Sequence, residues 1–224
     1  FRQILTALVE TGLSTAVTIG FTTNLTVWDQ EIVDLLGNFS TVHLGMSVEA
    51  FDPVNDYARW PSKIEKVVEI RDRWVAYGKS NHWLLQLRTT PTLLTISKLL
   101  SIYEYGWQHQ IPVESCNFLQ RPQCLRPTVL PMEYRDQHIK EMQQWIDQYN
   151  IDSNTVVNLR HPDLVHQYLL QDLQSYVNYL SNESDESYMI SDTVQYLKTL
   201  ESSRGNSVLD YLPEYEHLFR SAGY

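Results

Sequence analysis

The sequence predicts an α/β fold, in which residues 1–150 form a partial parallel β/α barrel and residues 151–224 form a helical C-terminal appendage. Two observations lead to this prediction. Short β-rich runs alternate with helical stretches four times before residue 150, which is typical of a parallel sheet with crossover helices. After residue 151 the β-rich runs stop and only helical periodicity continues.

The first unit of this pattern begins with a helix rather than a strand. Apolar residues recur on one side of residues 1–11, and Gly12 is expected to end that helix. A strand is predicted over residues 16–21 and a helix over residues 29–36. Asp29 is a favourable cap for the second helix, because its negative charge lies at the positive helix end.

The second and third units repeat the order of strand and helix. The second strand is predicted over residues 41–48, and the helix after it over residues 62–77. The third strand is predicted over residues 82–89 and leads into a helix over residues 92–105. We expect Gly106 to end this helix, since glycine is common just beyond helix C-termini.

The last strand and the appendage complete the predicted order. A fourth strand over residues 111–118 precedes a turn-rich segment and a long helix over residues 132–149. Two further helices are predicted over residues 163–180 and 191–202, with an acidic, serine-rich linker between them.

Alternation of side chains gives each predicted strand one apolar face and one small or polar face. A sheet covered by helices on both faces would read as nearly continuous hydrophobic runs, so one face is expected to line an open, concave side that holds a polar ligand. In parallel β/α architectures the ligand lies near the carboxyl ends of the strands. The small or polar set comprises Thr18, Gly20, Thr22 and Asn24, then Gly45, Ser47 and Glu49, then Gln86, Arg88 and Thr90, then Ser115 and Asn117.

Composition narrows the classes of function. The net charge of −10 without a basic stripe disfavours nucleic acid, and no run approaches the roughly 20 apolar residues of a membrane span. We therefore expect a soluble protein without a nucleic-acid or membrane partner. Its two cysteines form neither a CxxC motif nor a disulfide framework, so a cytoplasmic location is expected. The substrate stays open between a small molecule and a peptide. Histidines at zinc-ligand spacing, a nucleophile elbow, a phosphate loop and a dinucleotide fingerprint are all missing from the sequence.

Four segments, TTNLTVWD, HLGMSVEAFDPVNDYARWPSKIEKV, LLQLRTTPTL and RGNSVLDYLPEY, together resemble radical S-adenosylmethionine (radical SAM) enzymes of the twitch-domain type. The resemblance covers the whole chain and is densest from Thr22 to Lys66. It implies the later part of a partial TIM barrel that binds S-adenosylmethionine. One departure is local: Glu49 and Ala50 stand where the family has Asp-Gly.

The resemblance also implies a set of cofactor-binding residues at the strand ends and in the turn after the second strand. Ser47 and Glu49 match a position that contacts the ribose or carboxylate region of the cofactor, and Arg59 could bind its carboxylate. Alternatively, Arg59 forms a structural salt bridge with Asp52 or Asp56. Arg88 and Thr90 come from the strand alternation alone and could reach the substrate or the cofactor, and Asn117 comes from its place at a strand end. Together with the residues from the resemblance, the full predicted set is Thr23, Asn24, Ser47, Glu49, Tyr57, Arg59, Arg88, Thr90 and Asn117.

The CxxxCxxC motif that holds the 4Fe-4S cluster of the family does not occur in this sequence, and Cys116 and Cys124 cannot replace it. The resemblance therefore implies a fragment whose iron-sulfur ligands lie upstream of Phe1. In the complete enzyme the cofactor would supply a 5′-deoxyadenosyl radical for hydrogen abstraction. Two alternatives stay open: a non-catalytic binding or assembly protein on the same scaffold, and an unrelated β/α-barrel lyase or isomerase that works through Glu49.

Overall fold

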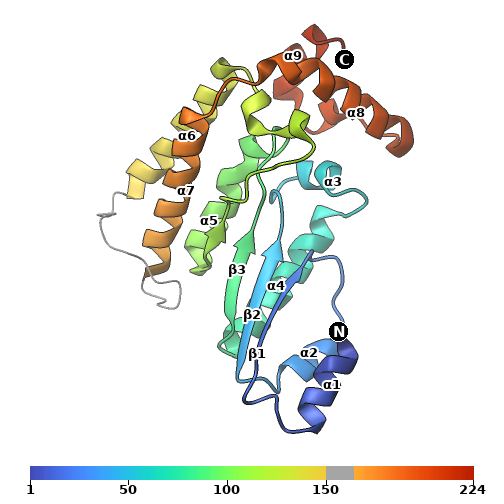
Figure 1. Ribbon diagram of the computed structural model, residues 1–224, viewed down its shortest axis with the longest axis vertical. Helices are drawn as coiled ribbons and strands as arrows, with labels where there is room; N and C mark the ends of the chain where they lie inside the picture. Colours follow the sequence, from blue (N-terminus) through green and yellow to red (C-terminus); the bar gives the residue numbers. More distant parts are fainter. Residues whose placement is uncertain (150–163) are drawn as a thin grey trace.

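The computed structural model describes residues 1–149 and 164–224. Its centre is a parallel sheet in which the strands lie in the order β1-β2-β3-β4, the same order as in the chain (Figure 1). Each connection therefore steps in one direction across the sheet, without the reversal seen in doubly wound folds. The strands are β1 (Thr18–Thr23), β2 (Thr41–Ser47), β3 (Leu84–Arg88) and β4 (Val113–Glu114).

Helices account for most of the remaining described chain. The α-helices are α1 (Arg2–Glu10), α2 (Gln30–Leu36), α3 (Val54–Ala58), α4 (Ile64–Ser80), α5 (Leu99–His109), α6 (Met132–Tyr149), α7 (Val165–Asn182), α8 (Ile190–Arg204) and α9 (Glu216–Ser221). Short 3-10 helices are η1 (Ile96–Lys98), η2 (Gln123–Leu125), η3 (Pro127–Val129), η5 (Ser187–Met189), η6 (Val208–Asp210) and η7 (Pro213–Tyr215). None of the helices described is long and apolar enough to cross a lipid bilayer.

Several predicted elements are confirmed. Helix α6 has the predicted bounds, and Asp29 caps α2 by accepting a hydrogen bond from the backbone N–H of Ile32 at 3.2 Å. Helix α1 ends before Gly12, whose φ of +73° is the left-handed conformation that glycine adopts without strain.

One face of the sheet is apolar and lies under the helices. The side chains of Leu44, Met46 and Leu87 on that face are fully or almost fully buried. Helix α4, which runs behind the strands in Figure 1, approaches so closely that a Cβ on Gly78 would lie 2.6 Å from Leu85 Cδ2. The alternating pattern predicts that this apolar face is buried, and its burial against the helices stabilises the fold through the hydrophobic effect.

The opposite face of the sheet is polar and partly exposed. Residues in register across the strands share a face, so Thr22, Gly45 and Gln86 form one row and Ser47, Arg88 and Glu114 the next. The predicted division into an apolar and a polar face thus holds for the first three strands.

The fourth strand differs from its prediction. Only Val113 and Glu114 pair with β3, and Val113 lies on the helix-covered face beside Leu87. Ser115 is consequently buried among the helices, and Glu114 takes the place on the open face that Ser115 was expected to hold. The prediction was wrong because a short, partly polar run leaves the phase of the alternation undetermined.

Gly106 lies inside α5 and does not end it. A Cβ at this position would lie 2.8 Å from the carbonyl oxygen of Ile111 and 2.9 Å from Val113 Cγ2. The glycine is therefore required by close helix–strand packing, and the helix continues to Gln110, which adopts a left-handed conformation.

Helix α7 joins the C-terminal region to the sheet. It lies beside α6 (Figure 1) and also packs against α5 and β4. Asp172 of α7 accepts hydrogen bonds from the backbone N–H and the hydroxyl of Ser115 at 3.1 and 2.8 Å. The hydroxyl of Tyr103 on α5 donates to the same carboxylate oxygen. One core thus includes residues from both sides of the predicted 150/151 boundary, which itself lies outside the described residues, as does the predicted start of the helix at Asp163.

Candidate functional site

The carboxyl edge of the sheet ends on three aligned polar side chains. Ser47, Arg88 and Glu114 are the last residues of β2, β3 and β4, and the register places Ser47 beside Arg88 and Arg88 beside Glu114. All three lie on the open face. This is the edge at which parallel β/α sheets bind their ligands.

Arg88 and Glu114 form an ion pair on this edge. Nε of Arg88 lies 2.8 Å from Oε2 of Glu114, and the two side chains are 40% and 31% exposed. The aliphatic stem of Arg88 lies over Gly45, where an added Cβ would be 2.9 Å from Arg88 Cδ. Gly45 therefore leaves room for the aliphatic stem of Arg88 on the polar face.

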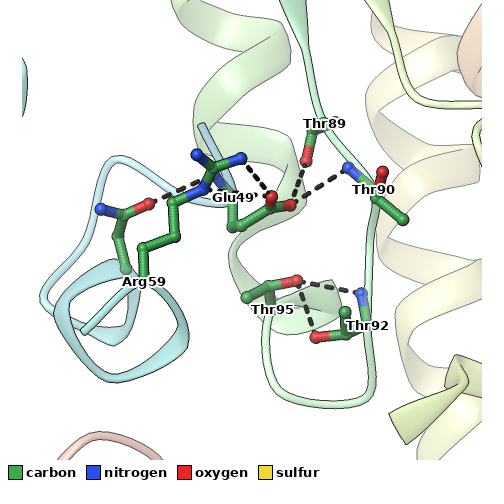
Figure 2. Close-up of polar contacts among 7 residues, drawn as sticks. Glu49, Arg59, Thr89, Thr90, Thr92 and Thr95 are labelled. Atoms are coloured by element: carbon green, nitrogen blue, oxygen red, sulfur yellow. Dashed lines mark hydrogen bonds and ion pairs between the residues drawn. The ribbon is translucent and has the colours of Figure 1, made fainter. Parts of the chain in front are cut away.

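Glu49 is the centre of a second cluster, just beyond the end of β2 (Figure 2). Its Oε1 accepts from Nε and Nη2 of Arg59 at 3.2 and 2.6 Å. Its Oε2 accepts from the hydroxyl of Thr89 at 3.2 Å and from the backbone N–H of Thr90 at 3.1 Å. Both carboxylate oxygens are thus each engaged by two donors, so this cluster joins the turn after α3 to the end of β3.

Local hydrogen bonds hold the two loops of this cluster in shape. The backbone N–H of Glu49 donates to the side-chain oxygen of Asn55, and the backbone N–H of Thr92 donates to the hydroxyl of Thr95 at 3.0 Å (Figure 2). Asp52 accepts from the backbone N–H of Val54 at the start of α3. The alternative that Arg59 pairs with Asp52 or Asp56 was wrong, since Arg59 pairs with Glu49.

Tyr57 does not reach the carboxyl edge. Its side chain is fully buried and its hydroxyl donates to Glu201 of α8 at 3.0 Å, while Nη1 of Arg204 donates to its backbone carbonyl. Burial, followed by the negative charge of Glu201, raises the pKa of the phenol. In this structure Tyr57 anchors α3 to the C-terminal helices.

The remaining predicted residues lie at the ends of β1 and β4. The hydroxyl of Thr23 accepts from the backbone N–H of Leu25, and Asn24 accepts from the backbone N–H and the hydroxyl of Thr26. These are turn-forming contacts of the kind that Thr and Asn side chains make locally. Asn117 is half-buried beyond the end of β4.

The two cysteines are poor candidates for cluster ligands. Burial, followed by the charge of Asp172, raises the pKa of the Cys116 thiol to about 12, and the pKa of Cys124 is also raised by burial. Over residues 1–149 and 164–224 no group of three or more His, Cys, Asp or Glu side chains could hold a metal ion. The described residues therefore do not fit a 4Fe-4S cluster.

A cavity of about 330 Å³ opens at the opposite, amino ends of the strands. His43, Lys79, Trp83 and Gln110 are among its lining residues, and none of the predicted site residues belongs to it. Gly45 and Gln86 of the polar face also line the cavity, so the cavity and the polar edge meet at Gly45.

Comparisons with protein-family models, curated proteins and solved structures find no match to this chain. The candidate site is therefore defined by its geometry. Sequence reasoning missed Glu114. Side chains alternate along a strand, so a residue directly after the buried Val113 should face the open side, where the neighbouring strand β3 ends in Arg88.

Proposed function

We propose that this chain is the later part of a radical SAM enzyme barrel, and that the carboxyl edge of its sheet faces the cofactor and the substrate. One observation supports this most directly. The strands are all parallel, follow chain order without reversal, and leave one polar face open, as in a barrel wall rather than a doubly wound sheet.

The free edge of β1 is consistent with an incomplete barrel. Among the described residues β1 pairs only with β2, and its strand carries no charged side chain or proline that would discourage pairing. Large apolar side chains are exposed nearby in the sequence: Phe1, Ile4, Leu13 and Val27. We propose that a further strand of the barrel pairs along this edge.

The donor set of the carboxyl edge fits S-adenosylmethionine, a small polar cofactor with hydroxyl, carboxylate and ammonium groups. The hydroxyl of Ser47 and the exposed charges of Arg88 and Glu114 would hold it. When bound beside a cluster, the cofactor supplies radical hydrogen abstraction. Because the described residues do not fit the cluster, the proposal places the cluster outside this chain.

Glu49 has a supporting role in this proposal. Its four donors hold the loops after β2 and β3 in place, and a cofactor hydroxyl would have to share or displace them. The same saturation argues against a lyase or isomerase that uses Glu49 as a free base.

Calorimetric titration of S-adenosylmethionine into the full gene product, prepared without oxygen, tests the proposal. We expect iron to copurify and Ser47→Ala to weaken cofactor binding by about tenfold, the effect of losing one hydrogen bond. The matched control is Ser80→Ala, since the Ser80 hydroxyl bonds only to its own helix at Ala76. A protein that contains no iron and binds no cofactor would overturn the proposal.

The second candidate is a non-catalytic binding or assembly protein on the same scaffold. It needs no cluster, and it uses the same open polar groups at the ends of β3 and β4. Under this alternative the carboxyl edge still binds a polar ligand, but without iron. The iron content of the full gene product therefore discriminates between the two.

A further inference from the structure

The two charged clusters at the carboxyl edge differ in how many of their hydrogen-bonding groups are already used. Glu49 accepts from four donors, whereas Glu114 accepts through Oε2 alone from one atom of Arg88. Within the described parts of the chain, both terminal nitrogens of Arg88 and Oε1 of Glu114 have no hydrogen-bond partner. Both carboxylate oxygens of Glu49 are therefore already used. In the second cluster the terminal nitrogens of Arg88 and one oxygen of Glu114 are available to a ligand.

The open groups have opposite charge and lie on neighbouring strands. Adjacent strands are about 4.8 Å apart, so a hydrogen-bond donor for a ligand carboxylate, Arg88, and an acceptor for a ligand ammonium, Glu114, lie side by side. The terminal nitrogens of an arginine bind a carboxylate through two parallel hydrogen bonds, and a carboxylate is a natural partner for an ammonium group. Neither contact requires the Arg88–Glu114 ion pair to break, because that pair uses Nε and Oε2.

We propose that Arg88 and Glu114 form a binding site for the α-amino acid group of a ligand, with its carboxylate on Arg88 and its ammonium on Glu114. The two ligand charges are separated by a single carbon atom, which suits the distance between neighbouring strands. A ligand with only one of these charges would leave one of the two groups without its partner.

Neighbouring residues define the surroundings of this site. Ser47 lies in register with Arg88 on one side, and Gly45 leaves room for the arginine stem beneath. On the other side lies Tyr168 of α7, whose pKa is raised first by burial and then by the charges of Asp172 and Glu114. The site is thus a polar strip at the carboxyl ends of β2 to β4, and a ligand would approach it from the open face of the sheet.

This inference rests on the proposed function and narrows it, since the carboxylate and ammonium of S-adenosylmethionine are themselves an α-amino acid group that Arg88 and Glu114 would hold. Its test uses neither iron nor S-adenosylmethionine. Loss of amino acid binding in a protein that keeps its iron and its cofactor binding would remove this inference alone, whereas amino acid binding by a full gene product that contains no iron would remove the proposed function alone.

The experiment is a titration of the protein with L-alanine, L-alaninamide and N-acetyl-L-alanine, followed by NMR of the arginine side-chain N–H groups. We expect L-alanine to bind with a dissociation constant on the order of 1 mM, since its two charge contacts are partly exposed to water. L-Alaninamide lacks the carboxylate charge and N-acetyl-L-alanine lacks the ammonium, and each should bind at least about tenfold more weakly.

Variants connect these differences to the two residues. Arg88→Gln and Glu114→Gln should each weaken L-alanine binding about tenfold, and Glu114→Gln should abolish the discrimination against N-acetyl-L-alanine. Arg220→Gln and Glu216→Gln are matched controls, because that exposed pair on α9 has the same 2.8 Å separation and should leave binding unchanged. Equal binding of all three ligands by the wild-type protein would overturn the proposal. So would the absence of binding at an L-alanine concentration about 50-fold above the expected dissociation constant. Both outcomes are measured on the wild-type protein, so they do not depend on whether the variants fold.

Discussion

Glu49 and Arg59 are joined by a 2.6 Å contact between Oε1 and Nη2, and the other oxygen of Glu49 is bonded to the end of β3. A single carboxylate therefore fixes the relative positions of the turn after α3 and the loop after β3. Glu49 thus links the loops that follow α3 and β3 beside the carboxyl edge (Figure 2).

Glu49→Gln should lower the free energy of unfolding by about 2 kcal/mol, because it removes a largely buried charge that accepts four hydrogen bonds, two of them from the Arg59 guanidinium. The Glu49 side chain is only 14% exposed, so water replaces little of the loss. Urea denaturation measures the effect. Glu69→Gln, at an exposed pair with Lys66, is the control and should change stability by less than about 0.5 kcal/mol. Equal effects of the two changes would contradict this view of Glu49.

Asp172 should make stability fall as pH rises above the ordinary aspartate pKa. Burial raises the pKa of its carboxyl above 3.8 in the folded state, so the folded protein binds the proton more tightly than the unfolded chain. The contribution is lost from about pH 3.8 upward, through the raised folded pKa. Asp172→Asn should remove it. We therefore expect the unfolding free energy of this variant, measured relative to that of the wild type, to increase as pH increases. A difference between the two proteins that does not change with pH would refute the expectation.

Gly106→Ala should destabilise the protein by about 1–3 kcal/mol, because the new methyl group would overlap the carbonyl of Ile111 and the side chain of Val113. Gly20→Ala is the matched change, since the nearest atom to its Cβ, on His43, is 4.0 Å away. Thermal unfolding of both variants checks the prediction. A similar melting temperature for the two would show that α5 can move away from β4 at little cost.

Cys116 should react slowly with iodoacetamide. A pKa of about 12 leaves very little thiolate at pH 8, and the greater nucleophilicity of that thiolate compensates only in part, so alkylation at least about thirtyfold slower than that of a free thiol is expected. Asp172→Asn should accelerate it, because the charge of Asp172 contributes to the raised pKa. Mass spectrometry of the modified peptide measures the rate. Reaction as fast as a free thiol would contradict the burial of this group.

The sequence predicted best those elements that depend on local side-chain chemistry or on a clear helical period. The cap at Asp29 and the bounds of α6 follow from local side-chain chemistry and periodicity, and both are confirmed. Helix α3 was missed because five residues are too few to show a helical period. Gly106 was misread because glycine ends helices and also permits close packing, and only the tertiary structure separates these roles.

For the candidate site, the positions of the residues could be predicted from the sequence, but their partners could not. That Ser47, Glu49, Arg88 and Thr90 come together at the carboxyl ends could be predicted, since strand alternation and parallel order determine it. The partners could not. Arg59 pairs with Glu49, and Tyr57 turns toward Glu201, because these contacts join segments far apart in the sequence that no local pattern relates.

The anchoring of Tyr57 has a consequence for the order of events during synthesis. The groups that hold α3, the carboxylate of Glu201 and the guanidinium of Arg204, lie 144 and 147 residues further along the chain. A ribosome adds these residues long after β2 and α3 have emerged, so the turn that carries Arg59 stays without its support until α8 has been made. The contacts that anchor α3 to the C-terminal helices are thus among the last that the nascent chain can form.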